Sequence, residues 1–332
     1  MVQRVELAHG GGGTMTGELI DVVRQYIGNP MLDRLEDAAR LETTEHTAFT
    51  TDSFVVSPLL FPGGDIGRLA VAGTVNDLAV MGARPRYLSL ALIIEEGLPF
   101  DTLRRVLGSV RDTAEEAGVA VACGDTKVVE RGKADGLFIN TSGVGEVPEG
   151  IDISVRNARP GDAVVLSGEI GLHGVAVMAA RESLGFASSA VSDVAPLNRL
   201  VAPVVEHCDV HTMRDPTRGG CAAALHEIAE ASGVTVILDE AALPVPEVVA
   251  GACSILGTDP LDTPNEGKVL ILLPEEQAEE AVSRLREHEY GHAACVVGRA
   301  EPRRDRFPVL LRTALGERLV DAPRGELLPR IC

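Results

Sequence analysis

The chain has 332 residues, 45% of them hydrophobic, a length that suits two domains with packed cores better than one. Its 49 acidic and 30 basic residues give a net charge of −19, which argues against nucleic acid and anionic membranes as partners. No apolar run reaches membrane-spanning length, and the opening MVQRVELAHGGGG lacks the apolar core of a signal peptide. We therefore expect a soluble, cytoplasmic protein, in which the six cysteines, none of them in a CxxC pair, are free thiols.

Two aspartates in the first third of the chain point toward a core. Residues 49–54 alternate as a strand, with Asp52 on the same side as Phe54. Residues 66–81 carry apolar side chains at helical spacing, which places Asp77 on or beside the apolar face. A buried carboxylate is costly unless it is paired, hydrogen-bonded or bound to a metal. The pair therefore suggests a cation and, with it, phosphates; the alternative is a helix cap and a satisfied buried aspartate.

The remaining pattern of the first half alternates strands and helices. We expect helices over 16–28, 30–41 and 99–117 and strands over 86–95, 119–130 and 136–147. Gly124-Asp125 interrupts the second of these strands, which places Asp125 and, two residues later, Lys127 at a strand end or bulge. These βαβ-like repeats complete an α/β first domain over residues 1–154, which ends in the polar, turn-rich segment 148–160.

The second half predicts another α/β domain, over residues 155–320. We expect strands over 162–167, 234–238 and 268–273 and helices after residue 174, over 221–231 and over 275–288. In RDPTRGG, Asp215 precedes a proline and a glycine pair at a helix start, a place that can bind an anion or a cation. His207, Cys208 and His211 are possible metal ligands, but no further Cys or His cluster completes a zinc site. Residues 321–332, DAPRGELLPRIC, predict an extended, mobile tail.

Several motifs together carry a resemblance to a known family. They are TTDSFVVSPLLFPGGDIGRLAVAGTVNDLAVMGARP, IIEEG, GDTKV, FINTSGVGEV, RDPTRGG and the final PRIC. Together they resemble the hydrogenase-maturation family HypE, along nearly the whole chain. The first motifs are shared more loosely with the wider aminoimidazole-ribonucleotide synthase superfamily, whereas the PRIC ending is far more restricted.

The resemblance implies a fold and a reaction. The expected fold is the two-domain α/β aminoimidazole-ribonucleotide synthase-like fold, in which the sheet of the N-terminal domain pairs with its twin in a homodimer. The implied enzyme is an ATP-dependent carbamoyl dehydratase. A HypF-type carbamoyltransferase loads a carbamoyl group onto the terminal thiol, and ATP then drives its dehydration to a thiocyanate. The cyanide passes to iron on a HypC–HypD scaffold, as a ligand for a [NiFe] hydrogenase.

The same resemblance assigns roles to individual residues. The expected catalytic groups are Cys332 as acceptor, Lys127 against the transferring phosphoryl group and Glu266 as proton acceptor or relay. The expected ATP-binding residues are Asp52, Asp77, Asp125, Lys127 and Asn140, and the expected Mg²⁺ ligands are Asp37, Asp52, Asp77 and Asp215. His46 is a weaker supporting candidate. Taken alone, Lys127 is typical of an exposed strand-end lysine and Glu266 of a loop carboxylate. For Cys332 the alternative is an incidental final residue.

Two other classes of function are open from the residues alone. One is another ATP-using enzyme of the superfamily, either a small-molecule kinase or a selenophosphate synthetase. The latter is expected to carry a reactive cysteine near its glycine-rich N-terminus, and residues 9–17 contain none. The other is a non-catalytic nucleotide-binding scaffold, which would bind ATP without turning it over. An extended tail of ten residues reaches on the order of 33 Å, enough to carry Cys332 between a cleft and a partner, a use that neither class has for it.

Overall fold

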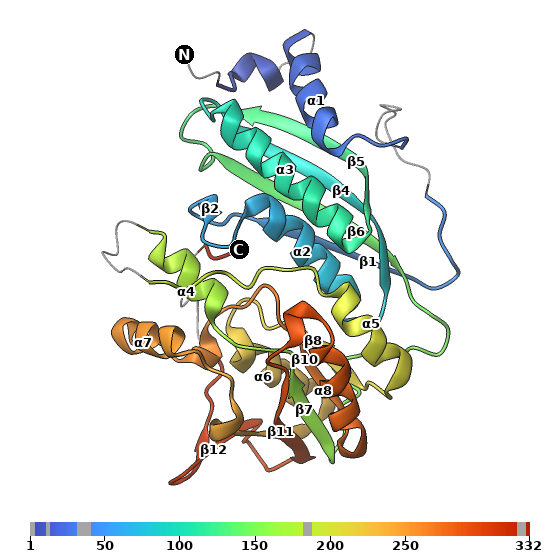
Figure 1. Ribbon diagram of the computed structural model, residues 1–332, viewed down its shortest axis with the longest axis vertical. Coiled ribbons are helices and arrows are strands. Elements are labelled where there is room, and N and C mark those ends of the chain that lie inside the picture. Colours follow the sequence, from blue (N-terminus) through green and yellow to red (C-terminus); the bar gives the residue numbers. More distant parts are fainter. Residues whose placement is uncertain (1–3, 11–13, 32–40, 182–187, 324–329) are drawn as a thin grey trace.

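The computed structural model describes residues 4–10, 14–31, 41–181, 188–323 and 330–332. The chain folds into two halves, each built on a β-sheet, and the end of the chain lies between them beside β2 (Leu60–Phe61) (Figure 1). The first half contains η1 (Leu7–Gly10), α1 (Thr14–Ile27), β1 (Thr47–Phe54), β2, β3 (Gly64–Asp65), α2 (Ile66–Ala79), β4 (Arg84–Glu95), α3 (Phe100–Ala117), β5 (Ala120–Val129) and β6 (Leu137–Glu146).

The sheet of the first half has the strand order β1-β6-β4-β5, with only β4 and β5 parallel. Strand β6 alternates strictly between buried and half-buried positions, because α2 and α3 cover one face of the sheet alone (Figure 1). Helix α2 begins where the carboxylate of Asp65 accepts hydrogen bonds from the backbone N–H groups of Gly67 and Arg68. It is buried nearly all round, since it lies between the sheet and the second half.

One expectation for this half differs from the structure, and a second cannot be compared with it. Strand β5 is continuous through Gly124 and Asp125, so the expected interruption there is wrong. The register irregularity lies earlier: Leu88 pairs with Val121 and Ser89 with Cys123, leaving one residue of β5 without a partner in β4. The expected helix over residues 30–41 falls largely on residues 32–40, outside the described part of the chain.

The second half is a seven-stranded sheet in the order β13-β12-β9-β11-β7-β10-β8. Its elements are β7 (Asp162–Leu166), α4 (Leu172–Ala179), α5 (Asn198–His207), β8 (Thr212–Arg214), α6 (Gly220–Ser232), β9 (Val234–Asp239), η4 (Glu240–Ala242), α7 (Glu247–Leu256), η5 (Pro260–Asp262), β10 (Leu270–Pro274), η6 (Glu275–Gln277), α8 (Ala278–Arg286), η7 (Glu289–Gly291), β11 (Cys295–Pro302), β12 (Val309–Thr313) and β13 (Gly316–Leu319). The expected helix 275–288 thus begins with a short 3₁₀ turn.

Both faces of this second sheet are covered at its centre. Every residue of β7 is buried, with Val164 and Leu166 packed into the core that contains α6. The alternate residues Ala163 and Val165 pack into the core that contains α5 and α8. A strand between two layers of helices needs apolar side chains on both faces, which explains the run AVVL. The buried Asp162 at its start is satisfied by Nδ1 of His211 at 2.9 Å.

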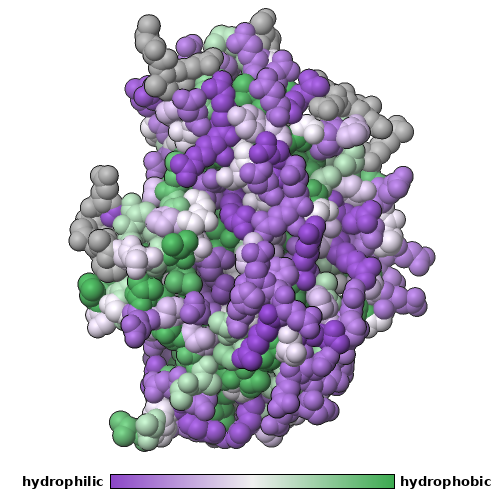
Figure 2. All heavy atoms as spheres, viewed as in Figure 1, coloured by the Kyte–Doolittle hydropathy of each residue, from purple (hydrophilic) through white to green (hydrophobic). Residues whose placement is uncertain are grey.

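Polar contacts join the two halves. Arg68 of α2 forms an ion pair with Glu116 of α3 at 2.8 Å and donates a hydrogen bond to the backbone carbonyl of Val194 at 2.9 Å. The hydroxyl of Tyr290, from η7, contacts both Arg68 and Glu116. The face in Figure 2 is largely hydrophilic, in keeping with the charge of the chain. None of the described helices is long and apolar enough to cross a membrane.

Candidate active site

A cavity of about 570 Å³ lies where the two halves meet. Its wall comes from β1, from α2, from the segment after β8, from the loop before β10 and from the end of the chain. The polar and charged side chains that line it are Thr50, Thr51, Asp52, Asp77, Arg214, Asp215, Thr217, Arg218, Glu266 and Cys332. Four of these residues are carboxylates, so the cavity places a group of acidic side chains beside a thiol.

The first half contributes Asp52 and Asp77. Asp77 lies in the last turn of α2, and its Oδ2 accepts a hydrogen bond from the Thr50 hydroxyl of β1 at 2.8 Å. Burial raises the pKa of the Asp77 carboxyl; the Thr50 hydrogen bond lowers it and the Asp52 charge raises it further. Asp52 faces the same side of β1 as Thr50, as alternation along the strand predicts, and its Oδ1 accepts from the backbone N–H of Ser53 at 2.7 Å.

The second half contributes Asp215 between β8 and α6. Burial raises the pKa of its carboxyl to about 7, the charge of Asp77 adds to this, and Arg214 opposes it. The chain turns into α6 through Gly219, whose φ of 78° is left-handed and favours glycine. The motif RDPTRGG therefore delivers a buried carboxylate and, three residues later, Arg218 to the same cavity.

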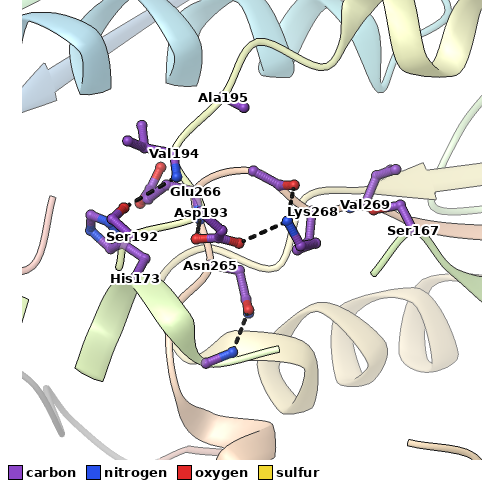
Figure 3. Close-up of polar contacts among 12 residues, drawn as sticks. Ser167, His173, Ser192, Asp193, Val194, Ala195, Asn265, Glu266, Lys268 and Val269 are labelled. Atoms are coloured by element: carbon purple, nitrogen blue, oxygen red, sulfur yellow. Dashed lines mark hydrogen bonds and ion pairs between the residues drawn. The ribbon is translucent and has the colours of Figure 1, made fainter. Parts of the chain in front are cut away.

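Glu266 lies on a tightly held loop between η5 and β10 (Figure 3). Its backbone N–H donates to Asp193 Oδ1 at 3.2 Å, and its carbonyl accepts from the backbone N–H of Ala195 at 3.3 Å. Lys268 Nζ lies 3.4 Å from Asp193 Oδ2. A Cβ on Gly267 would meet the carbonyl oxygen of Asp193 at 1.7 Å, so only glycine permits this approach. The loop therefore holds Glu266 in one position.

The side chain of Glu266 is almost fully buried, at 3% exposure, and its Oε1 has no hydrogen-bond partner among the described residues. Burial raises its pKa well above the ordinary value, and the charges of Asp215, Asp193 and Asp52 add to this. An unsatisfied buried oxygen is costly. Glu266 lines the cavity, where a ligand can supply the missing donor or cation.

The Cys332 thiol lies at the same cavity, 3.7 Å from Nη1 of Arg218. Burial raises the pKa of the thiol to about 12; Glu266 raises it further and Arg218 opposes this. The thiol is therefore neutral in this position and a poor nucleophile, since the thiolate is the reactive form.

The structure brings together only part of the predicted site. Asp52, Asp77, Asp215, Glu266 and Cys332 line one cavity. Asn140 is not part of the cavity wall: it lies on β6 opposite Ser53 of β1, where its Nδ2 donates to the Ser53 hydroxyl at 3.0 Å and to the backbone carbonyl of Asp52 at 2.8 Å. Asp125 and Lys127 are elsewhere, on the opposite edge strand β5, where they pair with each other at 3.2 Å with exposed side chains.

The other two candidates are His46 and Asp37. His46 is exposed and absent from the cavity wall. Asp37 lies outside the described residues. Within the described ranges no three His, Cys, Asp or Glu side chains are grouped so that they could hold a metal ion. His207, Cys208 and His211 therefore do not form such a group.

Sequence reasoning missed three residues that shape the site. Arg218 belongs to the motif RDPTRGG, but nothing in the spacing of that motif indicates that Arg218 faces Cys332. Asn76 is 1% exposed and crosses between the halves: its side chain accepts from Leu197 N–H at 2.7 Å and donates to the carbonyl of Ala195 at 3.1 Å. His173 is fully buried and contacts the carbonyl of Ile331. A polar residue inside an apolar helix was the available signal for Asn76.

Comparison with known proteins identifies the family. Residues 35–147 match the family model of the N-terminal domain of AIR synthase related proteins, and residues 159–309 match that of the C-terminal domain. The carbamoyl dehydratase HypE of Rhodobacter capsulatus is 48% identical over 336 residues, covering 99% of this chain and 98% of that protein. This chain belongs to the HypE family.

Solved HypE structures share the fold. The crystal structure of hydrogenase maturation protein HypE in complex with ATP matches with a TM-score of 0.94 and 47% identity, covering 98% of this chain and 99% of that one. HypE in a HypE–HypF complex matches with a TM-score of 0.81 and 45% identity, covering 94% of this chain and 100% of that one. The expected two-domain fold of the family is confirmed. The boundary at 154 and 155, the pairing of sheets in a homodimer and the mobile tail stay predictions.

Proposed function

We propose that this chain is an ATP-dependent carbamoyl dehydratase, which converts an S-carbamoyl group on Cys332 into a thiocyanate for cyanide supply to a [NiFe] hydrogenase. The observation that carries the proposal is the placement of the Cys332 thiol against Glu266, Asp215 and Arg218 in a single cavity. A superfamily kinase has no need of a cysteine there. Relatives 48% and 47% identical, one named carbamoyl dehydratase HypE and one solved with ATP, support both the reaction and the nucleotide.

The chemistry balances with ATP as a substrate. The carbonyl oxygen of the carbamoyl group attacks the γ-phosphorus and ADP departs, while one N–H proton is lost. The new C–O–P linkage makes that oxygen part of a leaving group. Loss of the second N–H proton with departure of phosphate leaves the nitrile, so the products are S-cyanocysteine, ADP and phosphate. Phosphoryl transfer of this kind depends mainly on positioning and on charge neutralisation.

Glu266 is the residue that we assign to accept a nitrogen proton. Glu266 lines the cavity, and its Oε1 has no hydrogen-bond partner among the described residues. Burial and neighbouring carboxylates raise its pKa, which makes its carboxylate form a stronger base. Arg218 lies 3.7 Å from the sulfur and holds the cysteine at this end of the cavity. Lys127 is proposed to neutralise charge on the transferring phosphoryl group.

The carboxylates of the cavity fit Mg²⁺ carried by a nucleotide. Mg²⁺ is commonly held by one or two protein carboxylates plus phosphates, and so needs no cluster of three protein ligands. Asp77 and Asp215 have pKa values raised by burial and by nearby carboxylates, an excess of negative charge that a divalent cation would relieve. Asp52, Asp77 and Asp215 would hold it, with Asp37 a further candidate. When bound, it would neutralise charge on the phosphates.

We propose that Cys332 receives the carbamoyl group in one position of the C-terminal residues and that the group is dehydrated in another. With a pKa of about 12 the docked thiol is neutral, so carbamoyl acceptance requires Cys332 to leave the cavity. A HypF-type carbamoyltransferase is the proposed donor, supported by a 45% identical relative solved as a HypE–HypF complex. A HypC–HypD scaffold is the proposed acceptor of cyanide. All six cysteines are free, which fits a reducing, cytoplasmic compartment.

We also propose a homodimer formed through the outer face of the first sheet. This face lies opposite α2 and α3, and it carries exposed or half-buried side chains, among them Phe49 at 69% and Ile93 at 40% exposure. Asp125 and Lys127 point to the same face. Pairing of two such faces covers this apolar surface. It also offers a route by which Lys127 of one chain approaches the cavity of another.

Intact mass spectrometry tests the reaction. The chain is incubated with the carbamoyltransferase, carbamoyl phosphate and ATP, and the Cys332→Ala variant serves as the control. The expected result is gain of one carbamoyl group followed by loss of one water, both absent in the variant. ATP hydrolysis without loss of water from the loaded chain would reject the proposal, and so would a carbamoyl group located elsewhere.

A further inference from the structure

Residues 330–332 lie against residues 55–57 and are joined to them by two backbone hydrogen bonds. The backbone N–H of Ser57 donates to the carbonyl of Arg330 at 3.2 Å, and that of Val55 donates to the carbonyl of Cys332 at 3.1 Å. Between them Ile331 is 2% exposed and packs into the core of the first half. The backbone and the Ile331 side chain are thus both held, which fixes where the sulfur of the next residue lies.

Two side chains from the second half bind the carbonyls of this segment. Nε2 of His173 lies 3.0 Å from the carbonyl oxygen of Ile331, and Nδ1 lies 2.8 Å from the Ser192 hydroxyl. A carbonyl only accepts, so Nε2 must carry the proton and Nδ1 must accept from Ser192. Arg181 donates from Nη2 to the carbonyl of Arg330 at 2.8 Å and from Nε to the carbonyl of Ser57 at 2.9 Å.

The side chain of Arg330 fastens the same segment to the first half. It donates from Nε to the carbonyl of Val55 at 3.1 Å, pairs with the carboxylate of Asp135 and lies over the ring of Phe138. The backbone of Arg330 is left-handed, with a φ of 54°, which costs an ordinary residue about 1 kcal/mol. The segment therefore adopts this turn only where such contacts offset it.

We propose that His173 and Arg181 are positioning residues that, with the Arg330–Asp135 pair, clamp residues 330–332 so that the group on Cys332 faces Glu266. The inference rests on the proposed function, because it concerns the placement of the carbamoylated cysteine. None of the clamp contacts uses the sulfur atom. The clamp therefore holds a free and a loaded Cys332 in the same place, while release of the clamp exposes the thiol for loading.

Thiol labelling tests the clamp without ATP or carbamoyl chemistry. The rate at which Cys332 is alkylated is followed by peptide mass mapping, with Cys332→Ala as the baseline and Arg111→Gln, an exposed arginine on α3, as the matched control. Loss of two hydrogen bonds in Arg181→Gln is expected to raise the rate about tenfold. His173→Leu should do the same, whereas His173→Gln, which keeps a donor, should stay near the wild-type rate. Equal rates in all folded variants would overturn the clamp.

Single-turnover dehydration of the carbamoylated chain separates positioning from general damage. In Arg181→Gln the rate constant for dehydration should fall about tenfold, while loading by the carbamoyltransferase should not become slower and the ATP concentration for half-maximal rate should stay unchanged. If the wild-type chain fails to lose water, the proposed function fails whatever the labelling shows. If dehydration proceeds normally in variants that label fast, the clamp is wrong and the function stands.

Discussion

The cavity and the outer face of the first sheet carry the proposed site residues in opposite environments. In the cavity, Glu266 and Asp215 are 3% and 8% exposed, and both have raised pKa values. On the outer face, the side chains of Lys127 and Asp125 are 67% and 61% exposed and pair with each other. An exposed pair of this kind contributes little to stability, whereas crowded buried carboxylates store unfavourable charge. The carboxylates of the cavity would be stabilised by a cation or a hydrogen-bond donor. The outer face would be stabilised by a protein surface that covers it.

The geometry of the sheet explains the separation. Strands β1 and β5 are the two edges of a four-stranded sheet, so their centres lie roughly 14 Å apart, at three strand spacings. Lys127 and Cys332 therefore do not meet within one chain. A second copy that packs its outer face on the first can bring its β5 toward the edge beside the cavity. The two regions then form one site only between chains.

Mixing two inactive variants is the sharpest test of this relation. Lys127→Ala and Cys332→Ala should each abolish dehydration, the first by loss of phosphoryl charge neutralisation and the second by loss of the acceptor. If the site is shared between chains, co-folding equal amounts restores about a quarter of the wild-type activity, because half the dimers are mixed and each has one complete site. Activity is followed as release of phosphate from the carbamoylated protein. If the mixture were as inactive as its components, Lys127 and Cys332 would act within one chain, and the proposal of a site shared between chains would be wrong.

The second largest effect is expected at the proton acceptor. Glu266→Gln keeps the size and the hydrogen-bonding loop but cannot take a proton, so single-turnover dehydration should fall by about 10²- to 10⁴-fold. Loading by the carbamoyltransferase should be unchanged. Glu130→Gln, at the exposed end of β5, is the matched control and should leave both steps intact. Comparable losses in the two variants would show that Glu266 has no special role.

How much of this could be read from the sequence differs between the two regions. Alternation along residues 49–54 and helical spacing over 66–81 correctly aimed Asp52 and Asp77 inward, because each pattern reports on one element and its nearest core. The contact between Arg218 and Cys332 spans 114 positions and depends on how two halves pack, which no local period encodes. For Asp125, the glycine before it suggested a broken strand, but pairing with β4 keeps β5 continuous.

A pair of glycine substitutions compares the crowding of the two regions. In Gly267→Ala the new methyl group meets the carbonyl of Asp193, so the segment that contains residue 267 or the segment that contains Asp193 must move. We expect this to lower the free energy of unfolding by about 3 kcal/mol. Gly132, in the turn between β5 and β6, has a φ of 79° but open space around it. Gly132→Ala should therefore cost only about 1 kcal/mol. Chemical denaturation measures both, and equal costs would mean that the Glu266 loop is not tightly held.

The smallest expected effect is a pH dependence of stability that comes from Asp215 in the cavity. The pKa of Asp215 is raised to about 7 in the folded chain, so between its unfolded value and about 7 the folded state binds more protons than the unfolded state. Stability from this group is fully present below the unfolded pKa and is lost as the pH rises through the folded pKa. Between about pH 5 and about pH 6.5 this loss amounts to about 2 kcal/mol.

Asp215→Asn removes this dependence, because an amide does not titrate in that range. Denaturation curves of both proteins at several pH values isolate the contribution of Asp215, since all other titrating groups are shared. As the pH rises, the free energy of unfolding of the variant should increase relative to that of the wild-type protein. Mg²⁺ with a nucleotide should stabilise only the wild-type protein, which keeps the carboxylate. A constant difference across the range would mean that Asp215 is charged in the empty cavity, and that the cavity tolerates more negative charge than its burial indicates.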